Sequence, residues 1–139
     1  MDIVVGHHDT AEGRAALERA VALATEEGAT LHLVHFSELP DQEEDPYRYV
    51  GARSEEEQQA EAFAERLRAD GVRCEVHHVR DAHEPAEALL SVARAASADL
   101  IVIGMRRRSR VGKLVLGSTS QTILLGSDCP VLSVKPHRE

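Results

Sequence analysis

The sequence predicts a single α/β domain over residues 1–139, with five parallel strands in the order 3-2-1-4-5 and helices on both faces. Short apolar runs alternate along the chain with longer segments of helical periodicity, as in a doubly wound sheet. The fourth run, 99–104 (DLIVIG), is almost wholly apolar and is typical of a strand covered on both faces. Right-handed crossovers then place the first and fourth strands side by side at the centre.

The first half of the chain predicts two strands around one helix. Residues 1–6 (MDIVVG) form an apolar run too short for a helix, which favours a buried strand. Thr10 is expected to cap the following helix, because small apolar residues then recur at spacings of three and four, and Gly28 is expected to end it. Residues 30–36 (TLHLVHF) alternate as a second strand.

A second helix and a third strand follow a long polar stretch. Residues 37–52 are acidic, contain two prolines and predict a loop. Ser54 and Glu57 have the spacing of a capping box at the start of the helix, which Gly71 is expected to end. Residues 72–79 (VRCEVHHV) alternate as the third strand.

The last third of the chain predicts two helices and two strands. Pro85 lies near the first turn of a third helix, where the missing N–H costs little. Residues 117–125 follow the fourth strand as a short helix, and 130–135 (PVLSVK) form the last strand. The inner face of the third helix is expected to consist of Ala88, Leu89, Val92 and Ala96.

Positive charge is concentrated in the loop after the fourth strand, although the chain carries a net charge of −8. In doubly wound sheets ligands bind beyond the carboxyl ends of the strands, where the winding reverses, and this loop begins there. Gly117-Ser118-Thr119 opens the next helix, whose free N–H groups favour an anion. The loop therefore predicts a phosphate site, unless it is only a solvated turn. The forked donors are Arg106, Arg107, Arg108 and Arg110.

Four stretches resemble the universal stress protein family over nearly the full chain. They are DIVVGHHDT with the Ala-Leu helix after it, LHLVHF, ADLIVIGMRR, and VGKLVLGSTSQTILLGSDCPVLSVK. ATP-binding members carry Gly-x2-Gly-x9-Gly-Ser/Thr, and here Gly104 and Gly117-Ser118 keep the outer positions while Arg107 replaces the second glycine. The family's usual Asp in the first loop is His8, and Thr10 keeps the nearby hydroxyl.

The resemblance implies a Rossmann-like fold and a stress-response module that binds an adenine nucleotide, ATP or AMP. Mg²⁺ could bridge its phosphates, although the sequence shows no dedicated carboxylate. The implied base side is Gly6, His7, His8, Thr10 and Phe36, and the implied phosphate and ribose side is Ile103, Gly104, Arg106, Arg107, Gly117, Ser118 and Thr119.

The last strand is apolar and is expected at a sheet edge, which invites pairing with another chain. The resemblance implies the same, since family members form dimers by antiparallel pairing of these strands. The expected interface is Val131, Leu132, Ser133 and Val134. A nucleotide-free dimeric interaction or signalling protein with an unknown protein partner is the alternative function.

Other functions are not expected. His7-His8 and His77-His78 are neighbours that point to opposite faces, so neither pair chelates one metal by itself. No nucleophile has a base and an orienting third group, so no catalytic residue is assigned and any ATP hydrolysis would be slow. The acidic body opposes nucleic-acid binding. No apolar run is long enough to cross a membrane, and the N-terminus lacks an export signal, which favours the cytoplasm.

Overall fold

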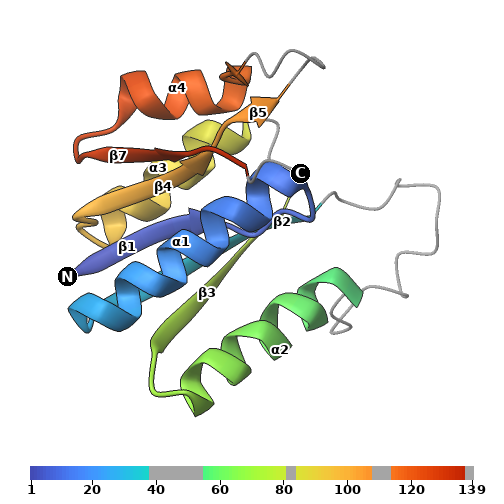
Figure 1. Cartoon of the computed structure of the whole chain (residues 1–139), viewed down its shortest axis with the longest axis vertical. Coiled ribbons are helices and arrows are strands. Elements are labelled where there is room, and N and C mark those ends of the chain that lie inside the picture. The colour runs from blue at the N-terminus through green and yellow to red at the C-terminus, as the bar shows by residue number, and fades with distance from the viewer. Residues whose placement is uncertain (38–54, 81–83, 108–113, 137–139) are drawn as a thin grey trace.

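The computed structural model describes residues 1–37, 55–80, 84–107 and 114–136. Five strands form one parallel sheet in the order β3-β2-β1-β4-β7, which confirms the order 3-2-1-4-5 (Figure 1). The winding reverses between β1 and β4. The strands are β1 (Asp2–Gly6), β2 (Thr30–Ser37), β3 (Arg73–Arg80), β4 (Leu100–Gly104) and β7 (Val131–Val134).

Four helices connect the strands. α1 and α2 pack on one face of the sheet, and α3 and α4 pack on the other (Figure 1). The helices are α1 (Ala11–Glu27), α2 (Glu55–Ala69), α3 (Pro85–Ala95) and α4 (Ser118–Gly126). Among the described residues, none of the helices has the length and apolar character needed to cross a membrane.

α1 begins and ends at the residues predicted from the sequence. The side chain of Thr10 accepts a hydrogen bond from the backbone N–H of Gly13, so Thr10 is the N-cap. Gly28 ends the helix with a φ of 64°, a left-handed conformation that glycine adopts without steric cost. Gly71 follows α2 with a φ of 88°.

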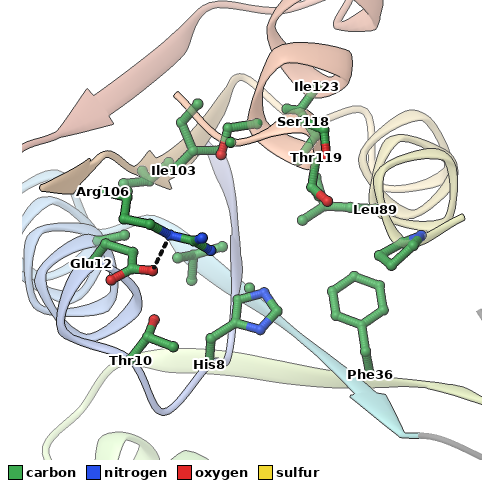
Figure 2. Close-up of a pocket in the computed structure, with 18 residues that line it drawn as sticks. His8, Thr10, Glu12, Phe36, Leu89, Ile103, Arg106, Ser118, Thr119 and Ile123 are labelled. Atoms are coloured by element: carbon green, nitrogen blue, oxygen red, sulfur yellow. Dashed lines mark hydrogen bonds and ion pairs between the residues drawn. The ribbon is translucent and has the colours of Figure 1, made fainter. Parts of the chain in front are cut away.

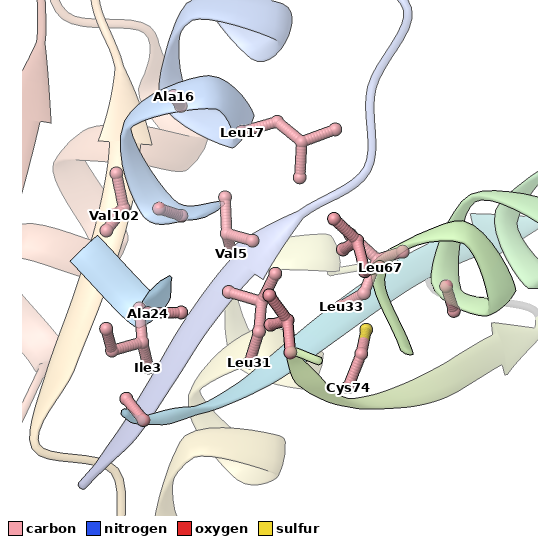
Figure 3. Close-up of a cluster of buried hydrophobic side chains, with 14 of the residues drawn as sticks. Ile3, Val5, Ala16, Leu17, Ala24, Leu31, Leu33, Leu67, Cys74 and Val102 are labelled. Carbon is pink, nitrogen blue, oxygen red and sulfur yellow. The ribbon is translucent and has the colours of Figure 1, made fainter. Parts of the chain in front are cut away.

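Alternate residues of each central strand enter two separate cores. Val5 packs with α1 and α2, whereas Val4 packs with α3 and α4 (Figure 3 shows the first core). Both valines are fully buried, as are Leu31, Leu33 and Ile101. Each such side chain contributes about 1.5–3 kcal/mol when it leaves water, which allows an aliphatic core to stabilise a chain with few aromatics.

The inner face of α3 differs from the expected one. Ala86, Leu89, Leu90 and Ala93 are the buried residues, whereas Ala88, Val92 and Ala96 are only partly buried. Glu87, Ser91 and Arg94 mark the exposed side of the helix, and the buried residues lie opposite them, about one residue away from the expected face.

A short antiparallel ladder was not expected. β5 (Arg106–Arg107) pairs with β6 (Leu114–Val115) immediately after β4. This pairing returns the chain toward the end of β4, so that Gly117 begins α4 beside the strand ends. The ladder therefore positions the start of α4.

Glu57 anchors the first turn of α2 to the end of β3. Its carboxylate is buried and accepts hydrogen bonds from Nε and one terminal nitrogen of Arg80, at 3.3 and 3.1 Å. The sequence suggested only a capping-box role for Glu57, and Ser54, the other half of that box, lies outside the described residues. The contact with Arg80 depends on the sheet and has no local sequence signal.

His35 lies in the core beneath α2. It is 5% exposed, and neither ring nitrogen has a hydrogen-bond partner among the described residues. Its ring lies 5.9 Å from that of His7 and 5.8 Å from that of His78, centroid to centroid. Burial lowers the pKa of His35, His78 and His8 lower it further, and Glu56 and Glu57 offset part of the effect.

We expect acidification to destabilise the protein partly through His35. Because its folded-state pKa lies below 6.5, the unfolded chain binds more protons once the pH falls below 6.5, and the free energy of unfolding decreases. Each such proton is worth up to about 1.4 kcal/mol per pH unit. Urea unfolding at pH 7.5 and 5.5 should show a smaller loss for His35→Leu than for the wild type. Equal losses would mean that His35 does not carry this dependence.

Candidate functional site

A cavity of about 350 Å³ opens at the carboxyl ends of β1 and β4, where the winding of the sheet reverses. It is bounded by the start of α1, the end of β2, the start of α3 and the start of α4 (Figure 2). The lining consists of Val5, Gly6, His8, Thr10, Glu12, Ala16, Phe36, Pro85, Leu89, Val102, Ile103, Gly104, Arg106, Gly117, Ser118, Thr119, Ser120 and Ile123.

The first turn of α4 forms one wall. Gly117 is the N-cap and makes no side-chain capping bond, and Ser118, Thr119 and Ser120 follow it along the lining. The first N–H groups of a helix have no partner within the helix and carry its positive partial charge. Together with the three hydroxyls, this wall offers donors suited to an anion.

His8 and Phe36 form the wall on the opposite side of the cavity. Their rings stack at 5.7 Å between centroids, with an interplanar angle of 10° (Figure 2). A Cβ on Gly6 would lie 2.8 Å from Nε2 of His8, so glycine allows the ring to fold back over the end of β1. Burial and the nearby His7 lower the pKa of His8, although Glu12 partly offsets them. A neutral imidazole has one donor and one acceptor for a polar ligand.

An ion pair crosses one side of the cavity. Nε of Arg106 lies 3.3 Å from Oε1 of Glu12, and the Glu12 side chain is 23% exposed (Figure 2). Glu12 was not predicted as a site residue from the sequence. The available signal was its position two residues after the N-cap Thr10, which places it at the same strand ends. The carboxylate offsets some of the positive charge that Arg106 brings to the cavity.

The structure brings together most of the residues predicted for the site. Ten of them line the cavity: Gly6, His8, Thr10, Phe36, Ile103, Gly104, Arg106, Gly117, Ser118 and Thr119.

His7 and Arg107 are the exceptions. The ring of His7 packs against His35 and Phe63 on the α2 side of the sheet, outside the cavity lining. Consecutive residues leaving a strand tend to point to opposite faces, so His8 enters the cavity and His7 does not. Arg107 belongs to β5, and its side chain lies outside the described part of the chain, as do Arg108 and Arg110.

The apolar floor of the cavity was not predicted from sequence. Its side chains come from β1, β4 and three different helices, and no local spacing connects them. They are Val5, Ala16, Pro85, Leu89, Val102 and Ile123. Only the packing of α1, α3 and α4 against the sheet shows that these residues share a site.

The two glycines of the loop have different roles. A Cβ on Gly104 would lie 2.3 Å from the backbone oxygen of Glu12, so this glycine lets α1 pack against the end of β4. A Cβ on Gly117 would meet no atom of the described residues within 4 Å, apart from its own chain neighbours. Both glycines line the cavity, but only at Gly117 is there room for a side chain.

The fold and the cavity define a doubly wound α/β protein with a ligand-sized hollow at its switch point. Residues 1–135 match the model of the universal stress protein family, and the chain belongs to that family. It is 34% identical to a universal stress protein of Mycolicibacterium smegmatis, over 97% of this chain and 98% of the relative. It is 37% identical to a universal stress protein of Thermus aquaticus, over 91% of each chain.

Solved structures of the family include nucleotide complexes. The chain is similar to a universal stress protein from Archaeoglobus fulgidus in complex with dAMP, with 25% identity, a TM-score of 0.61, and 97% of this chain and 98% of that chain covered. It is also similar to a universal stress protein in complex with cAMP, with 25% identity, a TM-score of 0.65, and 99% and 98% covered.

We expect Gly104→Ala to destabilise the protein by about 1–3 kcal/mol, because backbone atoms of α1 cannot give way to the new methyl group. Gly117→Ser should be close to neutral, because the site is open and serine is a good N-cap. Urea unfolding followed by circular dichroism compares the two variants. Equal losses of stability would contradict the assignment of Gly104 to packing.

Proposed function

We propose that this chain binds an adenine nucleotide, AMP or ATP, in the cavity at the carboxyl ends of β1 and β4. The observation that carries the proposal is that two walls of different chemistry face each other across the cavity. The start of α4 offers N–H and hydroxyl donors, and the His8–Phe36 wall offers aromatic surface and a neutral imidazole. A nucleotide has an anionic end and an aromatic end, so it matches both walls at once.

The phosphates are assigned to the start of α4. Ser118, Thr119 and Ser120 supply donors there, and Arg106 adds a guanidinium from β5. The base is assigned to the side of His8 and Phe36, above the apolar floor. The dAMP and cAMP complexes of similar family members support an adenine nucleotide over other anions.

Glu12 fits a role in holding Mg²⁺ with a bound nucleotide. Mg²⁺ is usually held by one or two carboxylates together with substrate phosphates and water, and Glu12 is the carboxylate in the lining. No carboxylate dedicated to Mg²⁺ was predicted from the sequence. In the absence of the ion, Glu12 would repel phosphate, and its pairing with Arg106 reduces that repulsion.

Isothermal titration with AMP, ATP and adenosine tests the nucleotide proposal. AMP should bind more tightly than adenosine, and Arg106→Gln and Gly117→Val should each weaken AMP about tenfold or more, since hydrogen bonds to charged groups contribute about 1.5–3 kcal/mol. Arg94→Gln is the matched control, because Arg94 lies on α3 beside Asp128 and outside the cavity lining.

The absence of heat at millimolar nucleotide would overturn the proposal. So would equal affinities for AMP in the wild type and in both cavity variants, since the site would then lie elsewhere. Circular dichroism shows whether Gly117→Val, which loses a favourable N-cap, remains folded.

The edge position of β7 favours a second function, that of a dimeric interaction protein. Among the described residues, β7 pairs only with β4, and Leu132 is exposed. Nearby on α4, Leu125 is 86% exposed, and such apolar surface favours association. We propose a homodimer through Val131, Leu132, Ser133 and Val134, formed by edge-to-edge pairing of two β7 strands.

The hydrogen-bond pattern of β7 gives a specific test of the homodimer. The carbonyl groups of Pro130 and Val134 accept hydrogen bonds from the N–H groups of Ile101 and Met105 on the β4 side. Backbone groups of a strand alternate in direction, so the N–H groups of Val131 and Ser133 point away from β4. Ser133→Pro removes one outward donor and leaves the bonds to β4 intact, so it should favour the monomer in light scattering after gel filtration. Ser133→Thr keeps the donor and should remain dimeric. A dimer that survives Ser133→Pro would exclude this edge.

A further inference from the structure

A cluster of ionisable side chains lies on the three strands β1, β2 and β3, away from the nucleotide cavity. His32 of β2 is in register with Glu75 of β3, and His77 follows Glu75 by two residues on the same face. Nδ1 of His32 lies 3.0 Å from Nε2 of His77 and 3.5 Å from Oε2 of Glu75. Nε2 of His77 lies 3.9 Å from the same Glu75 oxygen.

Asp2 fixes the orientation of His32. Nε2 of His32 lies 2.8 Å from Oδ1 of Asp2, so the imidazole donates its N–H to this carboxylate. Asp2 is itself held in place, because its backbone N–H donates to Oδ2 of Asp99 at 2.8 Å. The side chain of His32 is 6% exposed. A neutral His32 therefore presents the lone pair of Nδ1 to His77 and Glu75.

The Glu75 carboxylate and the imidazole of His77 converge on the same nitrogen of His32. His77 can donate its Nε2–H to Nδ1 of His32, but the Glu75 oxygen then faces the same Nδ1 as a second acceptor. A cation placed between these two acceptors would be bound by both of them and, once its Nε2 carries no proton, by His77 as well.

The separations match those of zinc ligands. Zn–N and Zn–O bonds of about 2.0–2.2 Å in tetrahedral geometry place ligand atoms about 3.3–3.6 Å apart. The three observed separations of 3.0, 3.5 and 3.9 Å bracket that range. The Asp2 carboxylate on the far nitrogen of His32 matches the carboxylate–histidine–zinc arrangement, in which the carboxylate sets the tautomer of the ligand.

We propose that His32, Glu75 and His77 form a Zn²⁺ site, with Asp2 as a positioning residue. Nδ1 of His32, one carboxylate oxygen of Glu75 and Nε2 of His77 are the ligand atoms. On binding, zinc replaces the proton shared by the two imidazoles, and His77 then carries its proton on Nδ1. Glu75 is 64% exposed, which leaves access for the ion and for water as the fourth ligand.

No metal site was expected from the sequence, because neighbouring histidines such as His77 and His78 point to opposite faces and do not chelate one ion by themselves. That alternation is observed: His78 pairs with Glu61 of α2 on the other side of the sheet. Glu75 lies on the same strand as His77, whereas His32 and Asp2 lie on neighbouring strands, and His32 is 45 residues from His77 in the sequence. Strand pairing brings His32 and Asp2 to the Glu75–His77 pair.

Titration of the EDTA-treated full chain with Zn²⁺, followed by calorimetry, tests the proposal. The wild type should bind one ion at this site, and His77→Ala and Glu75→Gln should each weaken it about tenfold or more. His78→Ala is the matched control, since it removes the adjacent histidine from the opposite face. Co²⁺ in place of Zn²⁺ should give the visible absorption of a tetrahedral site in the wild type and in the control.

Three outcomes would overturn the proposal. They are no binding by the wild type, binding unchanged in both ligand variants, and equal weakening in His78→Ala. Circular dichroism verifies folding, and AMP binding measured on His77→Ala separates failure of this site from failure of the nucleotide site.

Asp2 is tested separately as a positioning residue. Asp2→Asn should weaken Zn²⁺ about 10- to 100-fold, while the Co²⁺ spectrum keeps its tetrahedral form because the three ligands remain. Asp2→Glu should restore part of the affinity. Unchanged affinity in Asp2→Asn would show that Asp2 does not support the ligand.

Discussion

Burial of the central strands on both faces is the constraint on which the rest of the structure depends. Val4 and Val5 on β1, and Ile101 and Val102 on β4, enter opposite cores under different pairs of helices. To cover both faces, the chain winds from β1 toward β3 on one side of the centre and from β4 toward β7 on the other. The connections that leave β1 and β4 therefore run in opposite directions. The cavity lies at this divergence because no helix can cover the ends of both strands there.

The chemistry of the cavity depends on how tightly α1 approaches the sheet. Contact between Gly104 and the backbone of Glu12 brings the first turn of α1 against β4 and places the Glu12 carboxylate beside Arg106. The cavity therefore contains an acid as well as donors. For the proposed nucleotide, the charge balance between Glu12, Arg106 and the ligand would set whether phosphate binds directly or together with a cation.

The proposed sites use different regions of the same sheet. The cavity collects residues that leave the carboxyl ends of β1, β2 and β4, together with the starts of α3 and α4. The proposed zinc site collects side chains that project from within β1, β2 and β3, on the side where α3 and α4 pack further along the sheet. No residue belongs to both, so a metal and a nucleotide could occupy one molecule without sharing a ligand group.

The sequence by itself determined the order of strands and helices, the caps of α1 and most of the polar residues of the cavity. These features have local causes: Thr10 and Gly28 act on adjacent backbone, and Gly117-Ser118-Thr119 is contiguous. Only the tertiary structure decided that Leu89 lines the same cavity and that Glu12 meets Arg106. It also decided that His32 faces His77. These contacts join segments far apart in the chain, and their geometry is set by strand register and helix packing, which local periodicity does not encode.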